Sequence, residues 1–317
     1  MKSTLALHDG RAGNARQALA LARALDSRAG ECVLQPGWWA RTLAPRHWPL
    51  SIAPFGARFR KLCVMPPALA IGCGRQAALA TRLLRTHGSQ AVQILDPRIA
   101  ARHWDLLIVP EHDRLRGDTV LTLTGSLHPV DDDYLLRAIS AFPSLTMLPT
   151  PHTVLLVGGP TRHAPLDDAA FAAVLQQLAA LAKAEGGSFS AIASRRTPPM
   201  WRTALGAVAR DVPGLRWRDT GDGPNPYAGL LATADRLVCT PDSVNMLSEA
   251  AATYAPLFIV QPQIAQGRIR QFHQQLQDRG RAHALDATPR LFDAVPLRET
   301  ARVAAAVRQR LGLTAPA

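Results

Sequence analysis

The sequence predicts an α/β fold of two doubly wound, Rossmann-like domains in tandem. Short apolar segments alternate with helical patterns along almost the whole chain, which is typical of parallel sheets covered by helices on both faces. The alternation breaks at residues 142–153, FPSLTMLPTPHT, where three prolines lie close together, and then restarts. We therefore predict domains at residues 1–148 and 149–317 with a cleft between them. The last helix is a candidate to pack back on the first domain.

The first domain begins with a short strand, and Asn14 is then predicted to cap a helix that runs to about residue 28. Gln17 lies three residues after Asn14, in the manner of a capping box. Residues 36–60 are rich in Trp, Pro and Arg and are predicted to be irregular. The predicted strands are residues 4–7, 68–71, 91–95, 105–109 and 120–124, and the further helices are 75–87 and 131–141.

The second domain repeats the same alternation, and its elements follow one another with short connections. The predicted strands are residues 154–157, 189–193, 215–218, 236–239 and 257–260, and the helices are 167–185, 199–210, 226–233, 243–254, 268–278 and 298–311. In doubly wound folds the ligand binds beyond the carboxyl ends of the strands. We therefore look for chemistry in the loops that follow strands.

The net charge of +12 is carried almost entirely by arginine, because lysine occurs only at Lys2, Lys61 and Lys183. Such a charge is compatible with nucleic acid, an anionic membrane surface or a phosphate-bearing substrate, and an arginine excess also accompanies a GC-rich genome. The sequence argues against nucleic acid, because the arginines are spread along the chain and no block of five like charges occurs.

Location and redox state follow from the apolar segments and the cysteines. No apolar run approaches the ~18 residues that span a bilayer, and Leu5 to Leu7 is too short for the core of a signal peptide. We therefore expect a cytoplasmic protein. The four cysteines show no CxxC spacing and lie in or near apolar segments, so buried thiols are predicted at Cys32, Cys63, Cys73 and Cys239.

The loop after the first strand has the composition of a functional loop. His8 and Asp9 end the strand, and glycines flank the entry to a helix whose free N–H groups favour an anion or a carbonyl. The alternative is a tight βα turn that requires glycine. The candidate residues of this loop are His8, Asp9, Gly10, Arg11 and Gly13.

Three further loops of the first domain carry polar candidates. Arg75 lies in the first turn of a helix, where a cation is unfavourable unless it meets an anion, and Arg98 follows the strand at 91–95. Glu111 and His112, followed by Asp113, can supply an acid or base, a substrate contact or a metal site. They are equally compatible with a structural polar loop, as are Ser126 and His128 of the next loop.

The second domain offers residues suited to a diphosphate and a ribose. Glycines, hydroxyls and guanidinium groups in successive loops favour phosphate, a tyrosine can stack on a base, and the helix after residue 242 can hold phosphate at its N-terminus. Asn245 and Glu249 share one helix face, from which an acid can bind a ribose diol. The alternatives are caps, turns and a surface acid. The candidates are Gly158, Gly159, Thr161, Ser194, Arg195, Arg196, Asn225, Tyr227, Asp242, Ser243, Asn245 and Glu249.

Taken in order, the loop motifs resemble a known family. They are DGRAGNARQALALARAL, GCGRQAA, VQILDPR, LIVPEHD, LLVGGPTRH, SRRTPP, NPY and TPDSVNMLSEAAATYAPLFIV. The set resembles bacterial members of the mitochondrial-fission ELM family, which has a GT-B glycosyltransferase-like architecture. The resemblance implies that the second domain binds a nucleotide-sugar donor and the first domain the acceptor. Relatives often have His where this chain has Asn14, so Asp9 or His8 is the candidate catalytic base.

The resemblance implies a metal-independent glycosyltransferase, active in cell-envelope glycan synthesis, that needs no cofactor. Arg195 and the helix near Ser243 would stabilise the leaving diphosphate. A UDP-sugar epimerase and a non-catalytic scaffold linked to membrane dynamics remain alternatives. The basic, Trp-rich segment at residues 36–60 is predicted to contact an anionic membrane that carries a lipid-linked acceptor, at the inner face of the membrane; its alternative is a packed connection. The residues of this segment are Trp38, Trp39, Arg41, Arg46, Trp48, Arg58, Arg60 and Lys61.

Overall fold

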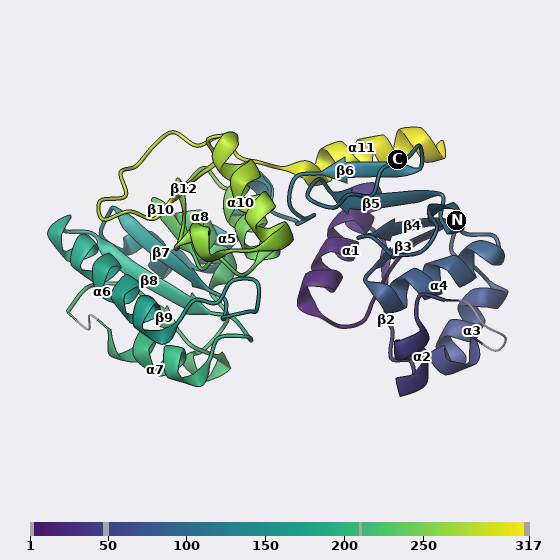
Figure 1. Cartoon of the computed structure of the whole chain (residues 1–317), viewed down its shortest axis with the longest axis horizontal. Coiled ribbons are helices and arrows are strands. Elements are labelled where there is room, and N and C mark those ends of the chain that lie inside the picture. The colour runs from purple at the N-terminus through teal and green to yellow at the C-terminus, as the bar shows by residue number, and fades with distance from the viewer. Residues whose placement is uncertain (1–2, 47–50, 209–210, 314–317) are drawn as a thin grey trace. The chain divides into compact units, whose positions relative to one another are not determined.

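The structure, a computed structural model, describes residues 3–46, 51–208 and 211–313. It consists of two compact units, each built on a six-stranded parallel sheet (Figure 1). Unit 1 comprises Met1–Pro129 and Glu299–Ala317, and unit 2 comprises Val130–Arg298. The predicted α/β class with two doubly wound, Rossmann-like units is therefore correct. No helix in the described part of the chain is long and apolar enough to cross a membrane.

Unit 1 has the strand order β2-β1-β3-β4-β5-β6. Alternate strand residues face two different core clusters, as a period of two requires. Ala6 and Ile71 pack under α1 and α11, whereas Leu7 and Ala70 pack under α3 and α4. The elements are β1 (Thr4–His8), α1 (Ala12–Leu25), β2 (Gly30–Val33), α2 (Trp38–Leu43), η1 (Ala53–Phe55), α3 (Gly56–Val64), β3 (Leu69–Cys73), α4 (Arg75–Thr86), β4 (Gln90–Ile94), η2 (Ala101–His103), β5 (Leu106–Pro110), β6 (Val120–Leu123) and α11 (Glu299–Leu311).

Unit 2 has the strand order β12-β11-β10-β7-β8-β9. Helices α6 and α7 cover one face of the sheet, and α5, α8, α9 and α10 cover the other. The elements are α5 (Asp132–Ala141), η3 (Pro143–Met147), β7 (His152–Val157), α6 (Asp168–Ala184), β8 (Ser188–Ala193), α7 (Pro199–Ala207), β9 (Arg216–Trp217), η4 (Thr220–Asp222), α8 (Tyr227–Thr233), β10 (Arg236–Cys239), α9 (Val244–Ala251), β11 (Leu257–Ile259), η5 (Pro262–Ile264), α10 (Gly267–Asp278) and β12 (Ala282–Ala284).

The division between the units differs from the predicted boundary at residue 148. Unit 2 begins at Val130, because α5 and the proline-rich segment after it belong to the core of unit 2. Leu135 and Leu145 lie in one cluster with Leu230 of α8, and a Cβ on Gly229 would lie 2.8 Å from Phe142. Helix α11, yellow in Figure 1, returns to unit 1 and packs beside α1.

The segment at residues 36–60 is more regular than its composition predicts. It contains α2, η1 and the start of α3. Helix α3 is amphipathic, because Phe59 and Cys63, four residues apart, bury one of its faces. Trp48 and its neighbours at 47–50 lie outside the described residues, as do the last two residues of the predicted helix 199–210. Strands β2 and β12 were not predicted, because each buries only one residue and so lacks an apolar run.

Part of the arginine charge is used inside the fold, on the carbonyl groups that end helices. Arg75 donates to the carbonyl oxygens of Thr42 and Ala44 at the end of α2, at 3.0 and 2.8 Å. Arg281 is buried and donates to Ala251 O at 2.7 Å at the end of α9, and burial lowers its pKa to about 10. The net charge is therefore in part a structural feature. As predicted, all four cysteines are buried and free.

Candidate functional site

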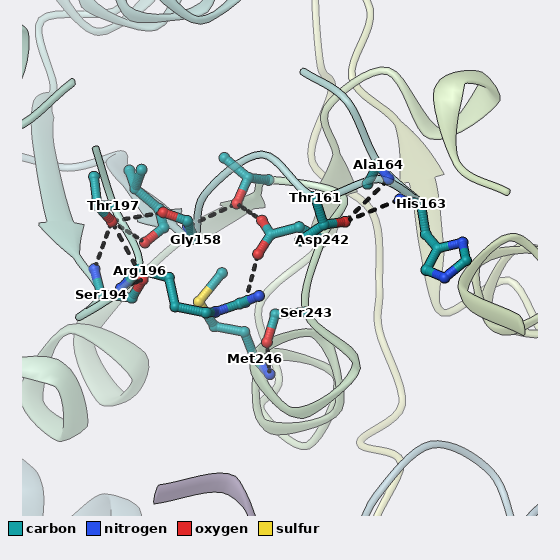
Figure 2. A network of polar contacts seen from close by, with 12 residues as sticks. Gly158, Thr161, His163, Ala164, Ser194, Arg196, Thr197, Asp242, Ser243 and Met246 are labelled. Carbon is teal, nitrogen blue, oxygen red and sulfur yellow. Dashed lines mark hydrogen bonds and ion pairs between the residues drawn. The ribbon is translucent and has the colours of Figure 1, made fainter. Parts of the chain in front are cut away.

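The polar residues of unit 2 gather at one edge of its sheet. All strand pairs of this sheet are parallel, so the loops after β7, β8 and β10 emerge at the same edge. Figure 2 shows the contacts that link Ser194, Thr197, Gly158 and Asp242 across these loops. The sequence predicted that these loops form one site, and the structure brings them together.

Asp242 forms the centre of this network. Its Oδ1 accepts a hydrogen bond from Thr240 Oγ1 at 2.7 Å, and its Oδ2 accepts one from Arg196 Nη2 at 2.5 Å. The Asp242 side chain is 2% exposed and that of Arg196 is 51% exposed. The buried carboxylate of Asp242 therefore holds the guanidinium group of Arg196 in place at the surface. A guanidinium group in a fixed orientation suits bidentate binding of phosphate.

Gly158 and Gly159 have packing roles. A Cβ on Gly158 would lie 2.2 Å from the Asp242 carboxylate, and a Cβ on Gly159 would lie 2.3 Å from the carbonyl oxygen of Arg196. The Gly158 N–H donates to Thr240 Oγ1 at 2.8 Å. Glycine is therefore needed so that the loops can approach one another. The amide of Gly158, which the sequence suggested for phosphate, has a protein acceptor.

Thr197 belongs to the loop after β8 that the sequence indicates for a diphosphate, although it is not among the candidate site residues. Its hydroxyl is buried, donates to Val157 O or Gly158 O at 2.9 or 2.6 Å, and accepts from Ser194 N at 2.9 Å. Ser194 Oγ accepts in turn from the Arg196 N–H at 3.2 Å. A hydroxyl three residues after a loop serine is the signal that could have indicated this turn. Thr197 fixes the loop that carries Arg195 and Arg196.

The side chain of Arg195, unlike that of Arg196, is not held by an ion pair with a residue that the structure describes. Arg195 is exposed, and its side chain makes no hydrogen bond or ion pair with any residue that the structure describes. The guanidinium group of Arg195 is therefore available to a ligand at the edge where Arg196 is fixed.

Helix α9 begins at this edge. Ser243 is its N-cap, and its Oγ accepts from Met246 N at 3.3 Å, so the predicted cap by Asp242 or Ser243 is formed by Ser243. Asn245 is half-buried, and Glu249 is only 2% exposed. Glu249 is thus an interior acid of unit 2 rather than a surface acid on a helix.

The other candidates of unit 2 make local turns. Thr161 Oγ1 accepts from the N–H groups of His163 and Ala164 at 3.3 and 3.1 Å (Figure 2). Asn225 Oδ1 accepts from the N–H of Tyr227 at 2.9 Å, directly before α8. Both side chains shape loops after strands.

His8 in unit 1 is held by two hydrogen bonds. The Gly10 N–H donates to its Nδ1 at 3.1 Å, so Nε2 carries the proton and donates to Glu31 Oε1 at 2.8 Å. The residue is 2% exposed. Because both ring nitrogens have protein partners, His8 is not placed to act as a base.

Asp9 is oriented by its neighbours. Its Oδ1 accepts from Asn14 Nδ2 at 2.9 Å and from Arg11 N at 3.2 Å, and Asn14 Oδ1 lies 3.6 Å from Cys73 Sγ at the end of β3. The predicted cap by Asn14 is wrong, because α1 begins at Ala12 with Arg11 as its N-cap. Asn14 instead links the loops after β1 and β3.

The remaining candidates of unit 1 lie in separate loops. Arg75 binds the end of α2, as described above, and Arg98 has a positive φ of 58° and an exposed side chain. Glu111 Oε2 accepts from Thr124 Oγ1 at 3.0 Å, and His112 is half-buried beside it. Gly13 lies in the first turn of α1. Among the described residues, no group of three or more His, Cys, Asp or Glu side chains is arranged to hold a metal ion.

The sequence of the chain is similar to those of known proteins. A family model described as mitochondrial fission ELM1 matches residues 12–311. The chain belongs to the mitochondrial fission ELM1 family. One curated relative is the mitochondrial fission protein ELM1 of Arabidopsis thaliana, which is 29% identical over 77% of this chain. The chain spans 64% of the length of that relative.

A second curated relative is bacterial, an uncharacterized protein of Rickettsia prowazekii, which is 25% identical over 80% of this chain and 82% of that protein. The chain is therefore similar to both a plant and a bacterial protein. It agrees with the resemblance seen in the loop motifs.

Solved structures show the same fold at low identity. S. aureus MnaA in a co-structure with UDP has a TM-score of 0.55 and 12% identity, covering 99% of this chain and 98% of MnaA. The UDP-GlcNAc 2-epimerase of Neisseria meningitidis, bound to UDP-GlcNAc, has a TM-score of 0.51 and 12% identity, covering 98% of this chain and 100% of the epimerase. MurG of Acinetobacter baumannii has a TM-score of 0.50 and 14% identity, covering 99% of this chain and 92% of MurG. The fold of the chain is that of GT-B proteins.

Proposed function

We propose that the chain is a metal-independent glycosyltransferase that binds a nucleotide-diphospho-sugar at the carboxyl edge of the unit 2 sheet. The observation that carries this proposal is the exposed guanidinium of Arg196, held by the buried carboxylate of Asp242. Arg195 lies beside it with no partner among the described residues, and α9 begins two residues after Asp242, at Val244. These three features together suit a diphosphate.

The chemistry follows from where charge develops. When the sugar leaves the donor, negative charge grows on the diphosphate, and groups that are already oriented toward this charge lower the barrier. The guanidinium groups of Arg195 and Arg196 and the first turn of α9 would supply that stabilisation. Arginine keeps its charge at neutral pH, so these side chains would act without a proton transfer.

The acceptor hydroxyl needs a base, and we assign that role to Asp9. Its carboxylate is oriented by Asn14 and by the Arg11 amide, whereas both nitrogens of His8 have protein partners. We propose an acceptor of the cell envelope that is lipid-linked or part of a glycan. The Asp9 side chain would remove the acceptor proton as the new glycosidic bond forms.

Two alternatives remain, each supported by a specific comparison. One solved structure of the same fold is a UDP-GlcNAc 2-epimerase bound to its sugar nucleotide, which favours an epimerase with the same donor contacts. The curated plant relative is described as a mitochondrial fission protein, which favours a scaffold without catalysis. The transferase and the epimerase need a nucleotide, and the scaffold does not.

The first experiment is a thermal-shift titration of the full chain with UDP, GDP, ADP and CMP. A ligand at about 100 times its dissociation constant adds ~2.7 kcal/mol of stability. We expect a diphosphate nucleotide to raise the melting temperature of the wild type and to raise that of an Arg195→Ala variant much less. Arg137, another exposed arginine on α5, gives the matched control, Arg137→Ala, which should respond like the wild type.

The outcomes separate the three functions. If none of the nucleotides shifts the melting temperature, the transferase and the epimerase are both excluded. If a nucleotide binds, transfer of the sugar to an added envelope acceptor, with release of the nucleoside diphosphate, supports the transferase, and interconversion of the sugar without an acceptor supports the epimerase.

A further inference from the structure

A second surface of the chain lies in unit 1, on α2 and α3. We call it the α2–α3 surface and define it by Trp38, Arg41, Arg60, Lys61, Val64 and Met65. The two helices pack on the same core cluster, which contains Ala44 at the end of α2 and both Phe59 and Cys63 of α3. Helix α3 contacts α4, and Arg75 of α4 donates to the carbonyl oxygens of Thr42 and Ala44 at the end of α2, so both helices lie beside α4 (Figure 1).

The α2–α3 surface exposes large apolar side chains. Trp38, Val64 and Met65 are 80%, 82% and 81% exposed. They are three of the five large hydrophobic side chains with at least 80% exposure among the described residues. Single exposed hydrophobic residues are normal on a protein surface. Several on two helices that lie beside the same helix, α4, indicate a contact with a partner or a membrane.

Positive charge accompanies the apolar side chains. Arg60 lies four residues before Val64, the last residue of α3, and shares a helix face with it, and Lys61 lies four residues before the C-cap Met65. The side chains of Arg41, Arg60 and Lys61 are exposed and form no hydrogen bond or ion pair with the residues that the structure describes. No aspartate or glutamate occurs between Glu31 and Asp96. The segment that forms this surface is therefore positive and contains no acidic residue of its own.

We propose that the α2–α3 surface docks on a lipid bilayer that contains anionic lipids. Cations are attracted to anionic headgroups, tryptophan favours the level of the headgroups, and apolar side chains on short helices insert below them. A second copy that docked through the same surface would bring the same positive charge to it and be repelled. This docking goes beyond the proposed donor site, since it uses only unit 1 and requires no nucleotide.

The test is flotation of the full chain, without nucleotide, on vesicles of two compositions. One contains phosphatidylcholine alone, and the other contains about 30% phosphatidylglycerol, which supplies the anionic charge. We expect binding to the anionic vesicles that falls by at least about tenfold when the salt is raised to about 0.5 M, because salt screens exposed charges. The triple variant Trp38→Ser, Arg60→Glu and Lys61→Glu should bind at least about tenfold less at low salt.

The control is a second exposed apolar and basic pair in unit 2, on α5. Leu136 is 62% exposed and is followed by the exposed Arg137, so Leu136→Ser with Arg137→Glu changes a similar surface elsewhere and should leave vesicle binding unchanged. The melting temperature of each variant shows that it is folded. In addition, the tryptophan emission of the wild type should shift to the blue on anionic vesicles, and Trp38→Phe should reduce the shift.

Several outcomes would overturn the docking proposal. They are no binding to anionic vesicles, equal binding to both compositions, equal binding of the triple variant and the wild type, and equal loss in the control variant. Self-association of the wild type that the triple variant abolishes, without vesicle binding, would assign the surface to a second copy instead.

Discussion

The carboxylate of Asp242 and the guanidinium of Arg196 form an ion pair in which the acid is buried and the base is half exposed. Oδ2 of Asp242 lies 2.5 Å from Nη2 of Arg196, with the acid 2% and the base 51% exposed. The acid follows β10 and the base follows β8, so the pair also joins two loops of unit 2. It therefore contributes both to the stability of the unit and to the position of a cation at its edge.

Arg196→Ala should destabilise the chain by about 1–3 kcal/mol, because it leaves a buried carboxylate without its charged partner. Arg195→Ala, which changes an exposed side chain without such a partner, should change stability by less than about 0.5 kcal/mol. Urea unfolding at pH 7 measures both. Equal stabilities of the two variants would show that the pair contributes little.

Gly158→Ala should destabilise the chain by about 2–4 kcal/mol, because its Cβ would lie 2.2 Å from the Asp242 carboxylate. Gly37→Ala is the control, since its Cβ would meet only the Trp39 side chain at 3.6 Å, an ordinary contact, and the φ of Gly37 is −56°. Urea midpoints measure both variants. A Gly158→Ala variant as stable as Gly37→Ala would show that the loops can separate at no cost.

Glu249→Gln tests the predicted contact between Glu249 and a ribose. Because Glu249 is buried, the ribose would have to reach a carboxylate in the interior of unit 2. If the carboxylate binds a ribose, the variant should bind UDP about tenfold more weakly, since a hydrogen bond to a charged group contributes about 1.5–3 kcal/mol. Its affinity for pyrophosphate, which has no ribose, should be unchanged. Arg195→Ala should weaken both ligands. Calorimetric titration separates the two patterns, and equal affinity of Glu249→Gln and wild type for UDP would remove the ribose assignment.

Two buried histidines predict a loss of stability in mild acid. Burial lowers the pKa of His273 to about 4, against the opposing effect of the Pro262 and Pro241 carbonyls, and burial also lowers the pKa of His152. Both pKa values lie below that of an unfolded histidine, ~6.5. Between pH ~6.5 and ~4 the unfolded chain therefore binds more protons than the folded chain, and stability falls as pH falls.

His273 alone should account for about 2 kcal/mol between pH 7 and pH 5. Urea unfolding at the two pH values measures this loss. His273→Leu should reduce the pH dependence by that amount, and His87→Gln, a change at an exposed residue, should not. The same pH dependence in His273→Leu and wild type would contradict the assignment.

The differences between the predicted and the observed elements have two physical causes. The predicted boundary at residue 148 relied on prolines, but Leu145 and Phe142 pack against α8, and such a contact between distant segments leaves no local pattern. Helix α3 was missed for the opposite reason: its apolar period is short and is surrounded by Trp, Pro and Arg, so composition obscured the spacing of Phe59 and Cys63.

The features of the candidate site are also of two kinds: those that local sequence predicts and those that depend on the tertiary structure. Loops after strands, a cap at Ser243 and a cationic loop at Arg195 and Arg196 follow from local sequence, because caps and turns depend on a few neighbouring residues. The partners of those residues depend on which strands become neighbours. Thus Gly158 and Asp242, 84 positions apart, meet because β10 pairs with β7.

The sequence by itself determined the α/β class, the two sheets, the loops that carry polar residues and the family. Periodicity and turn residues are local, and local patterns specify local structure. Only the tertiary structure decided that both ring nitrogens of His8 form hydrogen bonds, to Glu31 and Gly10, and that Arg75 caps α2. It also decided that Glu249 is buried and that Asp242 holds Arg196 at the surface. The role of a charged side chain depends on its burial and its partner, and both are fixed when distant segments pack together.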